Sequence, residues 1–125
     1  MRLLLDTHIY LWVLKGDRKL SKAAQALIQN ASEVYISSIS IWEAAIKAKL
    51  GKLDVDIDKL IGAISLSGFS ELPLTTKHIV EFDRLPNLHH DPFDRILIAQ
   101  AISEPLRLLT ANKILKNYSE LVEIT

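Results

Sequence analysis

The side chains in this sequence best suited to chemistry are carboxylates that adjoin predicted strands. Asp6 directly follows a run of three leucines, a pattern typical of a strand that is buried on both faces. Glu43 comes soon after a second strand, and Asp91 and Asp94 open the helix that precedes a fourth strand. Because ligands of open α/β sheets bind at the carboxyl ends of the strands, we expect these four acids to converge on one edge of a sheet.

Carboxylates gathered at one edge repel one another unless a cation joins them. Oxygen ligands suit hard ions, so the expected cofactor is Mg²⁺, with Mn²⁺ as the second choice. Such a site can hold a phosphodiester and activate a water, which predicts phosphodiester hydrolysis without a covalent intermediate. In this hypothesis Asp6 and Asp94 hold the ion, and Glu43 is either a ligand or the base for the attacking water. Asn112 and Thr110 would position a water or a second ion.

Each acid also has a purely structural explanation. Asp6 would cap the helix that follows it, and Asp91 would cap a helix that begins at the next residue, a proline. Glu43, expected in the first turn of its helix, would pair with Lys47 four residues later. Asp94 would interact favourably with the helix dipole. The sequence leaves open whether Asp91 is a metal ligand or only a cap.

Basic groups near the acids are the expected substrate contacts, although each is also compatible with a solvated surface charge: Arg95, His89, His90, and Lys47 or Lys49. His8 is a further candidate metal ligand. Trp12 is expected in the core or at an interface rather than as a platform for substrate.

The hydrophobic pattern predicts alternating strands and helices. Strands are expected at 2–7, 33–37, 69–74, 106–110 and 121–124, and helices at 8–14, 22–30, 38–50, 57–67, 75–85, 91–101 and 113–118. The third strand should lie near an edge because Pro73 interrupts it. In the helix at 38–50, Ile41, Ala45 and Ala48 are expected to face inward. Alternation of this kind predicts an α/β fold, with a central parallel sheet of about four or five strands and helices on both faces.

Composition narrows the classes of protein. The 125 residues predict a single domain over 1–125, and 49% apolar residues are enough for a core. The formal net charge is zero, so any contact with nucleic acid must come from a local patch. The absence of cysteine excludes disulfides and thiolate metal sites and agrees with a cytoplasmic location. No apolar stretch is long enough to span a membrane.

The whole chain resembles PIN-domain proteins of the VapC toxin type, the ribonuclease half of a toxin–antitoxin pair. Three motifs carry the resemblance: Leu-Leu-Leu-Asp-Thr-His at 3–8, Ser-Ile-Trp-Glu-Ala-Ala-Ile-Lys at 40–47 with Leu-Gly-Lys-Leu at 50–53, and His-Asp-Pro-Phe-Asp-Arg at 90–95 followed by Ile-Ala-Gln-Ala at 98–101. The resemblance implies a PIN-like three-layer α/β/α fold, and a metal-dependent endoribonuclease acting on single-stranded or looped RNA.

By the same resemblance, Asp6, Glu43 and Asp94 are the core metal-binding acids, and Asp91 belongs to the same subgroup pattern. Such families usually carry a fourth acid where this chain has Asn112, which loses a negative charge there. The resemblance further implies a homodimer and a small antitoxin, whose C-terminal segment would lie in a hydrophobic groove and present a basic side chain to the acids. Exposed apolar residues of the first helices, such as Trp12 and Leu14, are candidates for that groove or for the dimer contact.

Two other readings compete with this hypothesis. A haloacid-dehalogenase-type phosphatase needs a second aspartate two residues after the first, where this chain has His8. A phospho-accepting receiver domain needs paired acids at the first strand and a lysine after its last strand, and both are missing. An alternative from another class is a PIN scaffold of weak or no activity that binds RNA or an antitoxin, which Asn112 favours.

Overall fold

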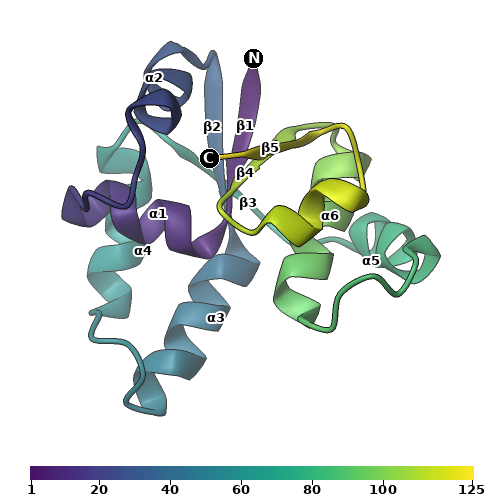
Figure 1. Cartoon of the computed structure of the whole chain (residues 1–125). Coiled ribbons are helices and arrows are strands. Elements are labelled where there is room, and N and C mark those ends of the chain that lie inside the picture. Colours follow the sequence, from purple (N-terminus) through teal and green to yellow (C-terminus); the bar gives the residue numbers. More distant parts are fainter.

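The computed structural model describes residues 1–125 and contains one sheet of five parallel strands (Figure 1). The strands follow the order β3-β2-β1-β4-β5 across the sheet, with bounds β1 Arg2–Leu5, β2 Glu33–Ser37, β3 Ser70–Leu72, β4 Arg107–Thr110 and β5 Val122–Ile124. The leucine-rich first strand lies at the centre, and the strand before Pro73 lies at an edge, as the sequence predicts. The predicted α/β class and parallel sheet are confirmed.

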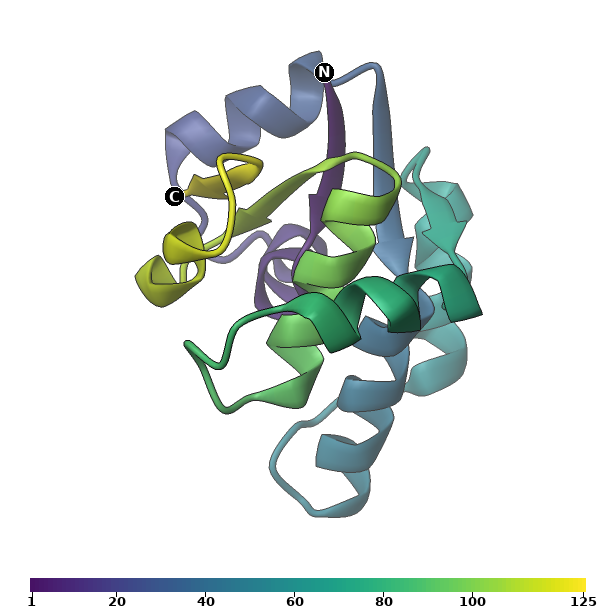
Figure 2. The same cartoon turned by 90° about the vertical axis from the view of Figure 1, so that its right-hand side faces the viewer.

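Six α-helices and one 3-10 helix connect the strands. Their bounds are α1 Thr7–Lys15, α2 Lys22–Asn30, α3 Ser38–Lys49, α4 Ile57–Leu66, α5 Thr76–Arg84, α6 Pro92–Ser103 and η1 Lys113–Asn117. Helices α1, α2 and α4 cover one face of the sheet, whereas α6 and η1 cover the other, with α5 packed on α6 (Figures 1 and 2). Helix α3 continues from the end of β2 (Figure 1). None of these helices is long and apolar enough to cross a bilayer.

The central strand divides the core into two layers because successive side chains of a strand point to opposite faces. Leu3 and Leu5 pack with α1, α2 and α4, and Leu4 packs with α6 and η1. All three side chains are fully buried, and each burial stabilises the fold by about 2 kcal/mol. The sheet therefore holds β1, and the residue that follows it, in a fixed place.

The ends of two elements differ from the sequence prediction in a way that affects the site. Strand β1 ends at Leu5 rather than at Thr7, because Asp6 already caps α1 by accepting a hydrogen bond from the Ile9 amide (2.8 Å). Helix α3 begins at Ser38, so Glu43 lies in its second turn and not in the first. Both residues remain close to the carboxyl ends of their strands.

Candidate functional site

Asp6 is the buried acid at the centre of the site. Its backbone amide donates to the Leu109 carbonyl of β4 (3.1 Å), which joins the end of β1 to the neighbouring strand. One carboxylate oxygen accepts from the Ile9 amide, and the other accepts from the Thr110 hydroxyl. Only 5% of Asp6 is exposed, and this burial raises its pKa against the opposing effect of those hydrogen bonds. Thr110 therefore contacts Asp6 directly, and its predicted role in positioning a water or a second ion stays a prediction.

Both carboxylate oxygens of Glu43 accept hydrogen bonds from neighbouring side chains. Its Oε1 accepts from the Thr7 hydroxyl (2.7 Å), and its Oε2 accepts from the Lys47 ammonium (2.7 Å). Ser40 lies 2.9 Å from the same Thr7 hydroxyl, and Glu43 itself is 3% exposed. These contacts fix the orientation of a buried charged group that would otherwise be costly to desolvate.

The buried face of α3 is therefore not the one that the apolar spacing predicts. It consists of Ile39, Ser40, Glu43 and Ala44. The expected inner residues Ile41, Ala45 and Ala48 are only partly buried. The sequence pattern misled because polar side chains of α3 turn inward to meet Thr7 at the start of α1.

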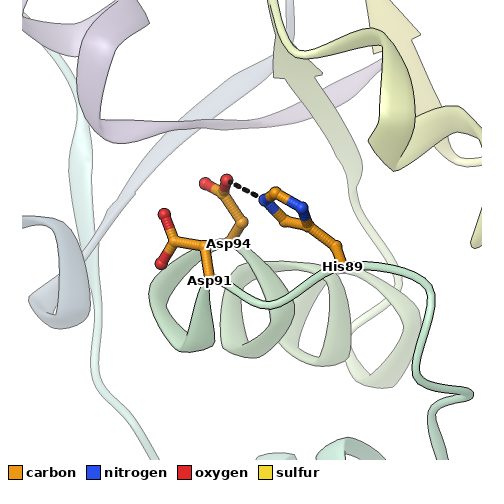
Figure 3. A group of neighbouring side chains, drawn as sticks. All are labelled: His89, Asp91 and Asp94. Carbon is orange, nitrogen blue, oxygen red and sulfur yellow. Dashed lines mark hydrogen bonds and ion pairs between the residues drawn. The ribbon is translucent and has the colours of Figure 1, made fainter.

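Asp91 and Asp94 lie in the first turn of α6, beside His89 (Figure 3). Asp91 caps the helix by accepting from the Phe93 amide (2.9 Å). Asp94 Oδ2 lies 3.2 Å from His89 Nε2, and the Asn112 amide donates to the same oxygen (3.4 Å). Ligand atoms of His89, Asp91 and Asp94 all fall within 4.8 Å of one another, which suits a shared cation.

Asp94 interacts electrostatically with acids from three elements: Asp91 of its own helix, Asp6 before α1 and Glu43 of α3. Burial, followed by the negative charges of Asp91 and Asp6, raises the pKa of Asp94 from 3.8 to about 6. The His89 hydrogen bond opposes this rise, and Glu43 adds to it. A raised pKa means that the negative form of Asp94 is destabilised, so a bound cation would reduce the repulsion between the carboxylates.

Asp6, Asp91 and Asp94 line a pocket of about 410 Å³, whereas Glu43 does not. Its lining residues are Asp6, His8, Trp12, His89, Asp91, Asp94, Ala111 and Asn112. Trp12 packs partly buried against the core, as expected, but it also lines this pocket. A usable signal was present in the sequence: His8 and Trp12 lie one turn apart on the helix that Asp6 caps.

The remaining predicted substrate contacts occupy different places. Lys47 forms an ion pair with Glu43, and His90 and Lys49 are exposed on the surface. The Arg95 guanidinium stacks 4.6 Å from the centre of the Phe82 ring, away from the residues that line the pocket. Of the predicted basic groups, only His89 lines the acidic pocket.

The donor set fits a hard divalent ion. Asp6, Asp91 and Asp94 offer carboxylate oxygens at the same pocket. Asn112 instead turns its amide nitrogen toward Asp94, and its amide oxygen accepts from the Ile114 backbone amide. Oxygen donors of this kind favour Mg²⁺ and Mn²⁺, and the imidazole of His89 is compatible with Mn²⁺.

Comparisons with known proteins agree with this architecture. A family model for the PIN domain matches residues 3–121. The chain is 29% identical over 117 residues to Ribonuclease VapC22 of Mycobacterium tuberculosis, which covers 92% of this chain and 90% of the relative.

Solved structures of low sequence identity share the fold. VapBC2 from Rickettsia felis, solved bound to a DNA fragment from its promoter, matches with a TM-score of 0.71 at 19% identity, covering 100% of this chain and 98% of that one. A toxin–antitoxin complex from Klebsiella pneumoniae matches with a TM-score of 0.67 at 23% identity over 97% and 95% of the two chains. DNA-bound VapBC from Salmonella typhimurium matches with a TM-score of 0.70 at 18% identity over 100% and 97%.

Proposed function

The chain belongs to the PIN domain family, and we propose that it is a metal-dependent endoribonuclease acting as the toxin of a cytoplasmic type II toxin–antitoxin pair. The observation that carries this proposal is the meeting of four carboxylates at the carboxyl edge of a parallel sheet: Asp6, Glu43, Asp91 and Asp94. Their mutual repulsion and burial favour a divalent ion and, with it, a phosphodiester.

Asp6, Asp94 and Asp91 would hold Mg²⁺ or Mn²⁺, and Asp91 would do so while it caps α6. The bound ion would neutralise phosphate charge and lower the pKa of a water. Glu43 would orient and deprotonate that water, because Thr7 and Lys47 hold its carboxylate in one orientation. Asn112 would position Asp94 through its amide.

RNA is the proposed substrate, a choice that the similarity to a ribonuclease of Mycobacterium tuberculosis supports. A recessed pocket beside a sheet edge accepts an extruded strand more readily than a duplex, which favours single-stranded or looped RNA. The resulting reaction is hydrolysis of a phosphodiester bond, with the strand cut internally.

A small antitoxin is the proposed regulatory partner, and the toxin–antitoxin complexes among the structural relatives support this choice. A mostly apolar groove of about 320 Å³ between α1 and α4 offers a place for its C-terminal segment; the apolar residues there are Leu11, Leu14, Val55, Leu60 and Ala63. A basic side chain of that segment would then neutralise the acids. We propose that the chain itself forms a homodimer.

One observation favours a second candidate function. Asn112 places an amide, rather than a fourth carboxylate, at the pocket and donates to Asp94. Loss of a negative charge there would weaken metal binding. The chain would then act chiefly as a scaffold that binds RNA or an antitoxin.

The decisive experiment is cleavage of an end-labelled, structured RNA by the purified chain, with Mg²⁺, with Mn²⁺ and with EDTA. Asp6→Asn removes the charge and keeps an oxygen acceptor for the Ile9 amide, so the helix cap survives. Asp54→Asn, at an exposed carboxylate, is the matched control. Cutting should require metal, disappear in Asp6→Asn and persist in Asp54→Asn.

The contrary result is a folded wild-type chain that cuts no member of a broad RNA panel with either metal. Binding of the same RNAs, or of an antitoxin peptide, under those conditions would then establish the scaffold function.

A further inference from the structure

The face of α1 beside the acidic pocket carries an aromatic pair that the proposed chemistry leaves unused. We propose that Trp12, with His8 beside it, forms a nucleobase subsite that stacks one unpaired base of the RNA next to a phosphate bound by a cation at the acids. This inference rests on the proposed function, because it needs a nucleic acid as the ligand. The subsite would be the part of the site that binds the base.

The rings of His8 and Trp12 lie on the same side of α1 because the two residues are about one helical turn apart. His8 and Trp12 stand four residues apart on α1, with ring centroids 6.4 Å apart and planes inclined by 52°. His8 is exposed and Trp12 is half-buried, and both line the pocket that contains Asp6 and Asp94. Trp12 also packs against the core, so the indole is already held before a ligand arrives and little side-chain entropy remains to be lost.

The division of charge within the pocket indicates which part of a nucleotide each wall would meet. Asp6, Asp91 and Asp94 repel phosphate unless a cation is present, so the phosphate belongs with the cation at the acids. The indole of Trp12 has no charge and offers a π-face, which suits a neutral base. His8 adds ring nitrogens that can hydrogen-bond to a base edge.

The size of the pocket limits the ligand to a small piece of nucleic acid. About 410 Å³ lies near the lower end of small-ligand sites, which suits one nucleotide rather than a stacked duplex. A base in a duplex hides its faces between its neighbours, so only an unpaired base could stack on Trp12.

The second tryptophan of the chain provides an internal comparison. Trp42 is 57% exposed and packs edge-on against Phe93 (ring centroids 5.3 Å). It lines a different, apolar pocket, between α3, α5 and α6, that contains none of the four carboxylates. Trp42 is thus at least as accessible to solvent as Trp12 but lies outside the acidic pocket.

The test compares binding of a short single-stranded RNA with binding of an abasic oligonucleotide of the same length, which keeps the phosphates and lacks the bases. Fluorescence anisotropy in Mg²⁺ reports both affinities, and every protein carries Asp6→Asn so that the RNA stays intact. With Trp12 present, the ordinary strand should bind about 5- to 150-fold more tightly than the abasic one, as stacking on an aromatic side chain predicts.

This preference should vanish in Trp12→Ala and largely persist in Trp12→Phe, which keeps an aromatic face and guards against a simple folding defect. Trp42→Ala should leave the preference unchanged. An unaltered preference in Trp12→Ala, or an equal loss in Trp42→Ala, would overturn the subsite. Absence of any preference or of any binding in the parent protein would overturn it as well.

Two further measurements distinguish the nucleobase subsite from an antitoxin contact and from the nuclease proposal. If Trp12→Ala weakens capture of a basic antitoxin peptide but leaves the preference for bases unchanged, the α1 face is a protein contact and the nucleobase subsite is wrong. Cleavage by the wild-type chain is scored separately. A preference for bases without cleavage would support the subsite and contradict the nuclease proposal. Cleavage without a preference for bases would support the nuclease and contradict the subsite.

Discussion

Asp94 should make the metal-free protein less stable than a variant in which its charge is removed. Its side chain is 19% exposed, and its pKa is raised from 3.8 to about 6, first by burial and then by Asp91 and Asp6. The folded state therefore binds the carboxyl proton more tightly than the unfolded state does. The associated stability is fully present below about pH 4 and is lost as the pH rises through about 6.

The size of this effect follows from the two pKa values. The difference between 3.8 and about 6 corresponds to about 3 kcal/mol, which is the cost of ionising Asp94 in the folded, metal-free chain. Asp94→Asn avoids that cost but weakens the contacts with His89 and Asn112. The net effect of Asp94→Asn should be a gain of about 1 to 3 kcal/mol above pH 7 and a loss of roughly zero to 2 kcal/mol near pH 4, where only the weakened contacts count.

Urea unfolding followed by circular dichroism, in EDTA at intervals from pH 4 to pH 8, measures this difference. Asp54→Asn serves as the control, because its exposed carboxylate should alter stability little at any pH. Added Mg²⁺ should reverse the order of wild type and Asp94→Asn above pH 7, since only wild type retains the full ligand set. The reasoning fails if Asp94→Asn is the less stable protein in EDTA at pH 7.5, or if the difference does not change with pH.

The two remaining predictions concern residues that adjust the charge of the site. Asn112→Asp should lower the free energy of unfolding in EDTA by about 1 kcal/mol, because it replaces a hydrogen-bond donor to Asp94 with a negative charge. It should also tighten Mg²⁺ binding measured by calorimetry, and weaker Mg²⁺ binding would contradict this reasoning. Lys47→Met leaves the buried Glu43 carboxylate without its cation and should cost about 1 to 2 kcal/mol in urea unfolding, whereas Lys49→Met, at an exposed position, should cost little; equal losses would argue against the ion pair.

The sheet could be predicted from the sequence because its signals are local. Three consecutive leucines marked the central strand, and Pro73 marked an edge. The convergence of the acids followed from topology alone, since carboxyl ends of parallel strands share one edge. Asp6 and Asp94 do line one pocket, whereas their roles as metal ligands stay predictions.

The parts that escaped prediction depend on contacts between distant residues. Glu43 faces inward because Thr7 lies opposite it, a pairing over 36 positions that helical spacing cannot reveal. Arg95 stacks on Phe82 of another helix rather than lining the pocket, which its position beside Asp94 did not indicate. Trp12 was expected in the core or at an interface, and it also lines the acidic pocket, whose opposite wall comes from residues such as Asp94 that are distant in the sequence.

The placement of Asp6 at the end of the central strand has a consequence for how such a protein can diverge. Its backbone is tied to β4, and the leucines before it are fully buried, so substitutions there would disturb the whole core. His8 on α1 and His89 in a loop are more accessible and are not tied into the sheet. If the proposed function holds, changes at His8 can therefore alter which RNA is bound without disturbing the core, whereas His89 also contacts Asp94.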